Sequence, residues 1–408
     1  MRVIADLHFH SKYSRAVSPK MMMPEIIKWA NYKGLNLIGS TDFTHPLWLG
    51  HLKENLEPLG NGLFKHKNIK GPKIMLTTEV SSIYTQGGKG RRIHNLIFAP
   101  SFETVEKINK KLGSIGNLYS DGRPILGISA KDLVKVVLDI DSTCLIVPAH
   151  AWTPWFSVFG SKSGFNSIAE CYEEMTKHIY AIETGLSSDP EMNWRLSMLD
   201  NISLISNSDS HSLPNLGREA NIFEVDRENY GYNDICDIIK SKDNKKFPAT
   251  IEFYPEEGIY HWDGHRACKV SLNPQESKKL NGICPVCHKP LTIGVLNRAD
   301  ELADRVEGHQ PKDVPASIHL VPLQEIIAEA IGSPKLGKKV QNEYLELINI
   351  FGNEFSMLLD KSKQELSKKM DSKIVEGIMN VRNNKVVKIA GYDGVYGKIK
   401  VFGGINEK

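Results

Sequence analysis

The sequence predicts an α/β protein, and three observations lead to that prediction. First, seven short apolar runs each end in polar residues, Gly or Pro, as the strands of globular proteins do. Second, helical patterns lie between most of these runs, an order typical of parallel α/β architectures. Third, the pattern changes near residue 255, where a Cys-containing stretch and several amphipathic helices follow. The alternation leaves open whether the sheet is doubly wound or closes into a barrel.

The expected elements can be placed in chain order. Strands are expected at residues 3–6, 35–39, 74–78, 93–99, 145–148, 180–183 and 204–207. Helices are expected at 25–32, 102–112, 130–138, 166–177 and 191–199, where Pro24 and Pro190 open two of them and Ser129 caps a third. Further helices are expected at 297–306, 321–331, 341–359 and 362–379. Residues 386–389 and 398–401, in a Gly-rich end, resemble the strands of a hairpin.

The composition is that of an ordinary globular chain of two or three domains. Of 408 residues, 41% are hydrophobic and 24% are charged, which excludes collagen-like, disordered and disulfide-stapled proteins. The net charge is +3, so the chain does not have the large basic excess of an obvious nucleic-acid binder. This charge neither identifies nor excludes a partner. Cys144, Cys171 and Cys236 are isolated and have no framework spacing. Together with the lack of a signal-peptide pattern and of any run of 18 apolar residues, they predict a cytoplasmic protein with no membrane partner.

Potential metal ligands stand near the ends of most strand candidates. His8 and His10 follow the first, and Asp209 and His211 follow the last; the i, i+2 spacing places both members of a pair on one side of a strand. The carboxyl ends of parallel barrel strands meet on one face, so the ligands should converge. We expect a metal site formed by His8, His10, Asp42, His45, Glu79, His94, His150, Asp209 and His211. Asp42 and His45 have an alternative, in which they orient other ligands instead.

This mixture of imidazole and carboxylate suits Zn²⁺, Mn²⁺ or Fe²⁺. A carboxylate such as Glu79 can bridge two ions, and paired ions stabilise the attacking and leaving oxygens of phosphoryl displacement. The hypothesis for the chemistry is therefore hydrolysis by a metal-activated hydroxide, with Glu79, Asp209 and His211 as the catalytic residues.

The same residues resemble the motifs of the PHP (polymerase and histidinol phosphatase) superfamily. The first motif is similar to Asp6-Leu7-His8-Phe9-His10-Ser11, and the later ones to Glu79, His94, His150 and Asp209-Ser210-His211. Where the superfamily has Thr-Asp-His, this chain has Thr41-Asp42-Phe43, with His45 as a stand-in. The resemblance implies a distorted (β/α)7 barrel over residues 1–250, a trinuclear site and phosphoesterase chemistry. The departure in the second motif leaves the number of metals at two or three.

A second metal site is expected in the Cys-containing stretch. Cys284 and Cys287 form a CxxC pair, and His265 and Cys268 form an HxxC pair 15 residues upstream. This spacing is that of a structural zinc site with four protein ligands. His261 or His288 could take the place of His265, and unrelated free cysteines are the alternative to a site.

The order of these parts resembles the endonuclease Q family over nearly the whole chain. Gly282-Ile283-Cys284-Pro285-Val286-Cys287 and Gly391-Tyr392-Asp393-Gly394-Val395-Tyr396-Gly397 are similar to segments of that family. The resemblance implies a DNA-repair endonuclease that cuts 5′ of deaminated bases (uracil, hypoxanthine, xanthine) and of abasic sites. We further expect a nucleoid-associated location, Zn²⁺ in both sites, and a requirement for Mg²⁺ or Mn²⁺ in the reaction. The domains would be a PHP barrel at 1–255, a zinc module at 256–310, and a helical region with a terminal hairpin at 311–408.

Contacts with single- or double-stranded DNA are expected around the metal site. Trp48, Trp152 and Trp155 follow ligand positions and could contact an extruded base, whereas Arg91, Arg92 and Arg218 could contact phosphates. The alternative for the aromatic residues is packing. The lysine-rich stretch 361–373 is either a DNA contact or a solvated helix face, and residues 341–347 are either a sliding-clamp peptide or a packed helix.

Two other functions compete with the endonuclease. One is a small-molecule PHP phosphatase, against which the zinc module and about 150 further residues argue, because monoester hydrolysis needs only the barrel. The other is a non-catalytic DNA-binding protein, against which the near-complete set of metal ligands argues.

Overall fold

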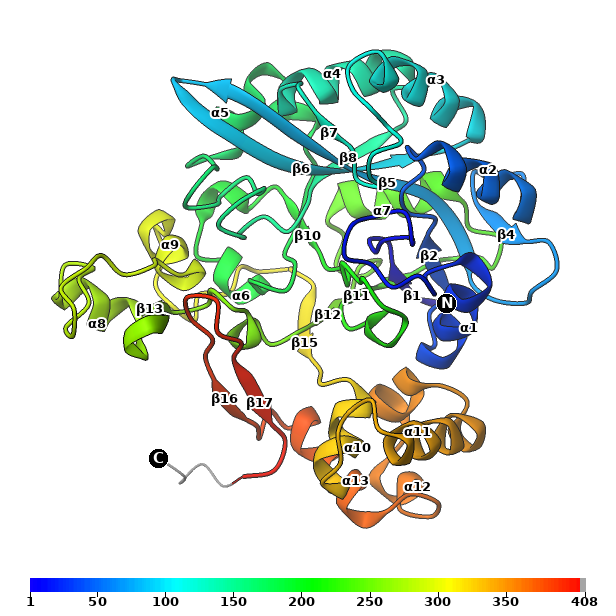
Figure 1. Cartoon of the computed structure of the whole chain (residues 1–408). Helices are drawn as coiled ribbons and strands as arrows, with labels where there is room; N and C mark the ends of the chain where they lie inside the picture. The colour runs from blue at the N-terminus through cyan, green and yellow to red at the C-terminus, as the bar shows by residue number, and fades with distance from the viewer. Residues whose placement is uncertain (404–408) are drawn as a thin grey trace.

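A curved mixed sheet of 11 strands dominates the computed structural model, which describes residues 1–403 (Figure 1). Its main path runs β15 (Ala316–His319), β12 (Ala249–Glu252), β11 (Ala220–Glu224), β1 (Arg2–Asp6), β2 (Leu37–Gly39), β5 (Lys73–Gln86), β4 (Phe64–His66) and β3 (Leu56–Pro58). Off this path, β6 (Lys89–Ala99) and β7 (Ile125–Leu126) pair with β5, and β8 (Leu145–Pro148) pairs with β6.

A separate parallel pair, β9 (Ala181–Glu183) and β10 (Ser203–Ile205), completes a ring of seven strands in the order β1, β2, β5, β6, β8, β9 and β10. The Ala151 backbone N–H, beyond β8, donates to the Glu183 carbonyl at 2.9 Å. On the other side, Phe9 beyond β1 forms a parallel bridge with Ser210 beyond β10. The seven strands of this ring are the seven expected from the sequence, and the α/β prediction is confirmed.

The expectation of purely parallel strands is wrong at β6, which runs antiparallel to both β5 and β8. The chain turns from β5 into β6 through Gly87 and Gly88, which have φ angles of +61° and +73°. Two residues cannot carry a crossover to a parallel strand, and two positive φ angles are those of a tight hairpin turn. A Gly-Gly pair between two apolar runs was the sequence signal for this hairpin.

Helices pack around the ring in the first part of the chain (Figure 1). They are α1 (Met23–Lys33), α2 (Pro46–Asn55), α3 (Phe102–Gly113), α4 (Ala130–Ile140), α5 (Ile168–Tyr172), α6 (Pro190–Asn193) and α7 (Tyr232–Ser241). The expected helix at 166–177 is interrupted at Glu173, whose φ of +46° ends α5 before a 3₁₀ turn. Ser129 caps α4 as expected, because its side chain accepts a hydrogen bond from the Asp132 amide.

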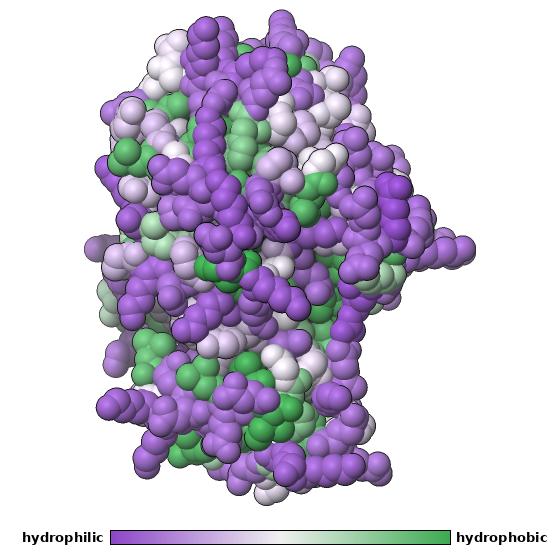
Figure 2. Space-filling model, turned by 90° about the vertical axis from the view of Figure 1, so that its right-hand side faces the viewer, coloured by the Kyte–Doolittle hydropathy of each residue, from purple (hydrophilic) through white to green (hydrophobic). Residues whose placement is uncertain are grey.

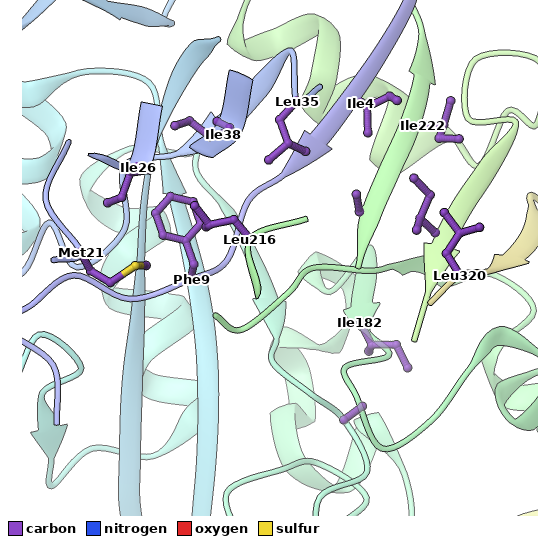
Figure 3. Packing of buried hydrophobic residues seen from close by; sticks show 14 of the residues in the cluster. Ile4, Phe9, Met21, Ile26, Leu35, Ile38, Ile182, Leu216, Ile222 and Leu320 are labelled. Atoms are coloured by element: carbon purple, nitrogen blue, oxygen red, sulfur yellow. The ribbon is translucent and has the colours of Figure 1, made fainter. Parts of the chain in front are cut away.

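The core lies where the ring and these helices meet. Phe9 packs among Met21, Ile26 and Leu216, and all four side chains are fully buried (Figure 3). Phe9 alternates with His8 and His10 along the extended chain after β1. Alternate residues point to opposite sides, so the burial of Phe9 turns both histidines toward the other side.

The Cys-containing part and the terminal hairpin lie side by side. The former comprises β13 (Asp263–His265), β14 (Val270–Leu272), α8 (Pro274–Lys279) and α9 (Val295–Leu302). The hairpin of β16 (Val387–Ile389) and β17 (Lys398–Lys400) is antiparallel, as expected. Its tip approaches the Cys-containing part, where Tyr392 forms a bridge with Trp262 (Figure 1).

The remaining helices form a group of their own: α10 (Leu323–Ile331), α11 (Lys338–Phe351), α12 (Lys363–Leu366) and α13 (Ser372–Arg382) (Figure 1). The expected helix at 341–359 ends at Phe351, because Gly352 takes a φ of +93°. Before this group, β15 pairs with β12 of the main sheet, so residues 316–319 lie with the barrel. Figure 2 shows a mostly hydrophilic face with scattered hydrophobic patches. None of the described helices meets the length and apolarity of a membrane span.

Candidate active site

Two groups of metal-ligand side chains meet on one side of the ring: His8, His10, His150 and Asp209 follow the strands β1, β8 and β10, whereas Glu79 and His94 lie within β5 and β6. In the first group, His8, His10 and Asp209 bring one ligand atom each within 4.8 Å of one another. His10 Nε2 lies 3.1 Å and His8 Nε2 3.7 Å from Asp209 Oδ1. β1 delivers both histidines and β10 delivers the aspartate, so residues 200 positions apart become neighbours through the closure of the ring.

Glu79 joins the first group to the second. Its Oε2 lies 3.3 Å from His10 Nε2 and 3.6 Å from His8 Nε2. Its Oε1 lies 2.7 Å from His94 Nδ1 and 3.1 Å from His150 Nε2. The carboxylate is fully buried and offers one oxygen to each group, which is the arrangement of a ligand shared by two ions.

The donor atoms of the first group fit a cation better than they fit one another. His8 Nε2, His10 Nε2 and Asp209 Oδ1 are buried, and none of them makes a hydrogen bond to any of residues 1–403. Buried polar atoms without partners are costly, and a divalent ion would satisfy all three at once. The nitrogen and carboxylate donors are those that Zn²⁺ and Mn²⁺ accept.

Two buried carboxylates orient His8 and His10 by contacting the Nδ1 atom of each ring. His8 Nδ1 lies 3.0 Å from both carboxylate oxygens of Glu183, and His10 Nδ1 lies 3.0 Å from Asp42 Oδ1. A carboxylate at Nδ1 fixes the proton there and leaves the Nε2 lone pair for a ligand. The structure therefore places Asp42 at the Nδ1 of His10 and outside both groups, which matches the alternative that it orients a ligand. Glu183 was missed, although it is the last residue of the one strand candidate to which no ligand was assigned.

His45 and His211 lie outside both groups. His45 stacks on Tyr13 at 4.5 Å between ring centroids, at the start of α2, and belongs to neither group. His211 lies closer: its ring centroid is 4.9 Å from that of His10, and its Nδ1 is 2.9 Å from the Asp209 carbonyl oxygen. Its side chain is one-third exposed, so it borders the site from the solvent side.

The electrostatics keep the shared carboxylate charged. Burial by itself would raise the pKa of Glu79, but His94, Arg123 and His8 hold it well below the usual range. Burial lowers the pKa of His94 to about 4 against the pull of Glu79. The Arg123 guanidinium lies 3.3 Å from Glu79 Oε2, and sequence reasoning missed this residue because no motif marks it.

Left-handed backbone at non-glycine residues marks the turns that present these groups. Asp42, His150 and Asp209 have φ angles of +42°, +30° and +43°. Such conformations are costly for residues with a side chain and cluster at functional sites. Gly185 allows the turn at His150, because a Cβ on Gly185 would lie 2.6 Å from the His150 Cβ.

A cleft of about 620 Å³ opens over the two groups. His94, His150 and Asp209 line it together with three arginines, Arg15, Arg92 and Arg123. Trp155 and Tyr260 line it as well, with ring centroids 5.9 Å apart and planes at 70°. Tyr260 comes from the segment that leads into the Cys-containing part, so two parts of the chain build this cleft.

Four residues expected at the DNA do not line this cleft. Trp48 and Trp152 are fully buried, and their indole N–H groups donate to backbone oxygens and to Asn193, respectively, so both are packing residues. Arg91 covers the Phe165 ring and donates to the Gly164 carbonyl. Arg218 donates to the Ser208 carbonyl at 3.0 Å. Burial depends on distant packing partners, which the local sequence does not show.

The Cys-containing part holds a third group. His265, Cys268, Cys284 and Cys287 bring their ligand atoms within 4.8 Å of one another, and Cys287 Sγ lies 3.3 Å from His265 Nδ1. The His288 backbone N–H donates to the Cys284 carbonyl at 2.9 Å and closes the turn between the two cysteines. Three thiols and one imidazole at these separations fit a tetrahedral zinc ion. Neither His261 nor His288 belongs to the group.

Comparison with solved structures decides the family. The chain is 32% identical to the lesion-specific endonuclease PfuEndoQ from Pyrococcus furiosus, covering 98% of this chain and 95% of that one, with a TM-score of 0.86. The chain belongs to the endonuclease Q family. A structure of endonuclease Q with a 27-mer duplex carrying an abasic lesion at the active site matches with the same TM-score and identity over 100% of both chains.

A relative of similar length and a domain model also match this chain. The uncharacterized protein YqxK of Bacillus subtilis is 28% identical over 98% of this chain and 99% of its own length. A family model described as the MJ0043 C-terminal domain matches residues 322–385, which contain α10 to α13. The resemblance to the endonuclease Q family, expected from the sequence, is confirmed over the whole chain.

Proposed function

We propose that this protein is a metal-dependent DNA-repair endonuclease that hydrolyses a phosphodiester bond beside a damaged nucleotide. One observation carries the proposal: the ligand groups that share Glu79 lie in an arginine-lined cleft of an endonuclease Q chain. Ligands alone would fit many hydrolases, and arginines alone would fit many phosphate binders. Their combination with a full-length match to a lesion-specific endonuclease favours DNA over a small phosphomonoester.

The proposed substrate is duplex DNA with an abasic site or a deaminated base (uracil, hypoxanthine or xanthine), cut on its 5′ side. The abasic lesion in the related complex supports the first part. The deaminated bases extend it by the resemblance of the sequence alone. A sliding clamp is not proposed as a partner, because residues 341–347 lie in α11, whose Val340, Tyr344 and Leu347 are buried.

The proposed metal ligands are His8, His10, Glu79, His94, His150 and Asp209, with Zn²⁺ as the first candidate and Mg²⁺ or Mn²⁺ as the alternative. Ions held there would polarise the phosphate and lower the pKa of a bound water. Glu183 and Asp42 would hold His8 and His10 in the tautomer that ligation needs.

The chain's own residues would bind and align the substrate. Arg92 and Arg123 line the cleft beside the ligands and would contact the phosphates flanking the scissile bond. His211, one-third exposed at the rim, would contact the same phosphate from the solvent side. Trp155, which is 39% exposed, would stack against the displaced nucleotide together with Tyr260.

The first prediction concerns the shared ligands. Glu79→Gln and Asp209→Asn should each lower nicking of an abasic duplex at least 100-fold, because each removes a charged ligand while keeping its shape. The measurement is single-turnover cleavage on a denaturing gel, with metal content determined in parallel. Asp226→Asn, at an aspartate whose side chain is 86% exposed, is the matched control and should retain full activity. Wild-type rates in either ligand variant would remove the proposed active site.

A further inference from the structure

We infer that the C-terminal hairpin positions the Tyr260 wall of the active-site cleft, and that Asp393 anchors the hairpin tip in the place where it does so. The inference rests on the proposed function, since it assigns the hairpin a role at that same cleft. The hairpin lies beyond the helical group in the sequence, yet its tip returns to the segment between the barrel and the Cys-containing part (Figure 1).

Backbone hydrogen bonds attach the tip to the whole of residues 256–262. The Gly391, Gly397 and Gly394 amides donate to the carbonyls of Glu256, Glu257 and Ile259 at 2.8, 3.1 and 2.9 Å. In return, the Trp262 amide donates to the Gly391 carbonyl at 2.9 Å. Ile259 and Tyr260 line the cleft, so the bonded segment is itself the cleft wall.

Glycine is required at two of these contacts. A Cβ on Gly391 would overlap the Gly258 carbonyl oxygen, and one on Gly397 would overlap the Glu256 carbonyl oxygen. Both obstacles are backbone atoms, which cannot rotate away as a side chain can. The Gly-rich end of the chain, which the sequence suggested only as a hairpin, is therefore shaped to lie directly against this wall.

Asp393 ties the same tip to the candidate zinc ligands. Its Oδ2 accepts a hydrogen bond from the Arg266 amide at 2.6 Å, and its Oδ1 accepts one from Thr292 Oγ1 at 2.7 Å. Arg266 follows the ligand His265, and Thr292 lies beyond the CxxC turn. One carboxylate thus links both ligand-bearing segments to the hairpin, while the amides around it hold the cleft wall.

Tyr260 would transmit this arrangement to the substrate. Its ring meets Trp155 of the barrel edge-on across the cleft, so a shift of the 256–262 segment changes the gap between two aromatic rings. Stacking depends on ring placement within fractions of an ångström. The active-site ligands lie in or just after ring strands, and within residues 1–403 they make no hydrogen bond to the hairpin, so the effect should fall on binding more than on the chemical step.

The test uses full-length Asp393→Ala on an abasic duplex. KM should rise about tenfold while kcat stays within about twofold of wild type. Tyr260→Ala should show the same pattern, and the double variant should be no worse than Tyr260→Ala alone, because both changes act on one contact. Asp393→Asn, which can still accept one hydrogen bond, should recover part of the loss. Asp313→Ala is the matched control, because Asp313 is an exposed aspartate that also has a positive φ, +57°. It should change neither KM nor kcat.

Hydrogen exchange gives a readout that does not need activity. In Asp393→Ala, the amides of residues 256–262 should exchange at least tenfold faster, whereas those of β1, β2 and β5 should be unchanged. Unchanged KM together with unchanged exchange would overturn the inference, as would fully additive losses in the double variant. A wild-type protein that fails to nick damaged DNA would overturn the proposed function instead, and accelerated exchange would still support the positioning role.

Discussion

Buried carboxylates in this protein fall into two kinds at the scale of single residues. Glu79, Asp42 and Glu183 each face imidazole nitrogens, and the attraction compensates their burial. Glu252 is equally buried but has no such partner: Thr184 Oγ1 donates to its Oε2 at 3.3 Å, and its Oε1 makes no hydrogen bond to residues 1–403. Burial and the nearby Asp189 and Glu191 raise the pKa of Glu252 to about 8.

This contrast predicts a pH-dependent gain from Glu252→Gln. In the folded protein Glu252 keeps its proton up to about pH 8, but in the unfolded chain it ionises from about pH 4.5 upward. The stability that comes from the neutral carboxyl is therefore present below pH 4.5 and is lost as the pH rises to 8. Glutamine does not ionise, so the variant's advantage in unfolding free energy should grow across that window, by about 1–3 kcal/mol, and then stay constant.

Urea unfolding at pH 5, 7 and 8.5 measures this advantage. Glu174→Gln, at a side chain that is 67% exposed, serves as the control and should not change the pH profile. If the wild type and Glu252→Gln lose stability in parallel between pH 5 and 8.5, the buried carboxyl is not the group that titrates.

At the scale of elements, a buried ion pair joins the helical group to the barrel within a shared apolar core. Lys33 at the end of α1 lies with its Nζ 2.7 Å from Glu354 Oε2, and the two side chains are 1% and 3% exposed. Tyr344 of α11 donates its hydroxyl to the same oxygen at 2.8 Å, and the Leu323 amide of α10 donates to the other at 3.0 Å. Glu354 therefore joins three helices at a single point.

Removing one partner of this pair should be costly. Lys33→Met leaves the Glu354 charge buried and unpaired and should lower the unfolding free energy by about 3–5 kcal/mol. The double variant Lys33→Met, Glu354→Gln should regain part of this loss, because the amide oxygen still accepts hydrogen bonds and carries no charge. Chemical unfolding measures both. A single variant as stable as wild type would mean that the pair does not hold the helical group to the barrel.

At the scale of the whole molecule, two parts of the chain line the cleft and a third holds one of its walls. The barrel supplies the ligand groups and the arginines, the segment before the Cys-containing part supplies Tyr260, and the terminal hairpin holds that segment. The domain boundaries expected at residues 255 and 310 remain proposals, since strand β15 beyond the second boundary pairs with β12. Function would therefore depend on the packing of parts that lie far apart in the chain.

Loss of the structural metal should reveal this dependence. Cys284→Ala should remove about one equivalent of zinc and make residues 256–310 sensitive to protease, because four-ligand zinc sites contribute directly to folding. The barrel should keep its remaining metal and its secondary structure. Cys144→Ala, at a buried barrel cysteine outside the group, should keep the full zinc content. Equal zinc content in both variants, by elemental analysis, would contradict the site.

The sequence by itself determined what depends on local pattern. The seven ring strands, the histidines and carboxylates at their ends, the CxxC and HxxC pairs and the terminal hairpin were all predicted, because strand periodicity and ligand spacing are written in neighbouring residues. Even Glu183 was within reach, as the final residue of a predicted strand. The family resemblance followed from the order of these parts.

Only the tertiary structure decided what depends on contacts between distant segments. Asp42 lies at the Nδ1 of His10 and outside both ligand groups, and Trp48 and Trp152 lie in the core, since burial is set by partners elsewhere in the chain. The hairpin came to lie on residues 256–262 for the same reason. Spacing along the chain specifies which chemical groups are available, but the closure of the ring and the packing of its appendages determine which of them meet.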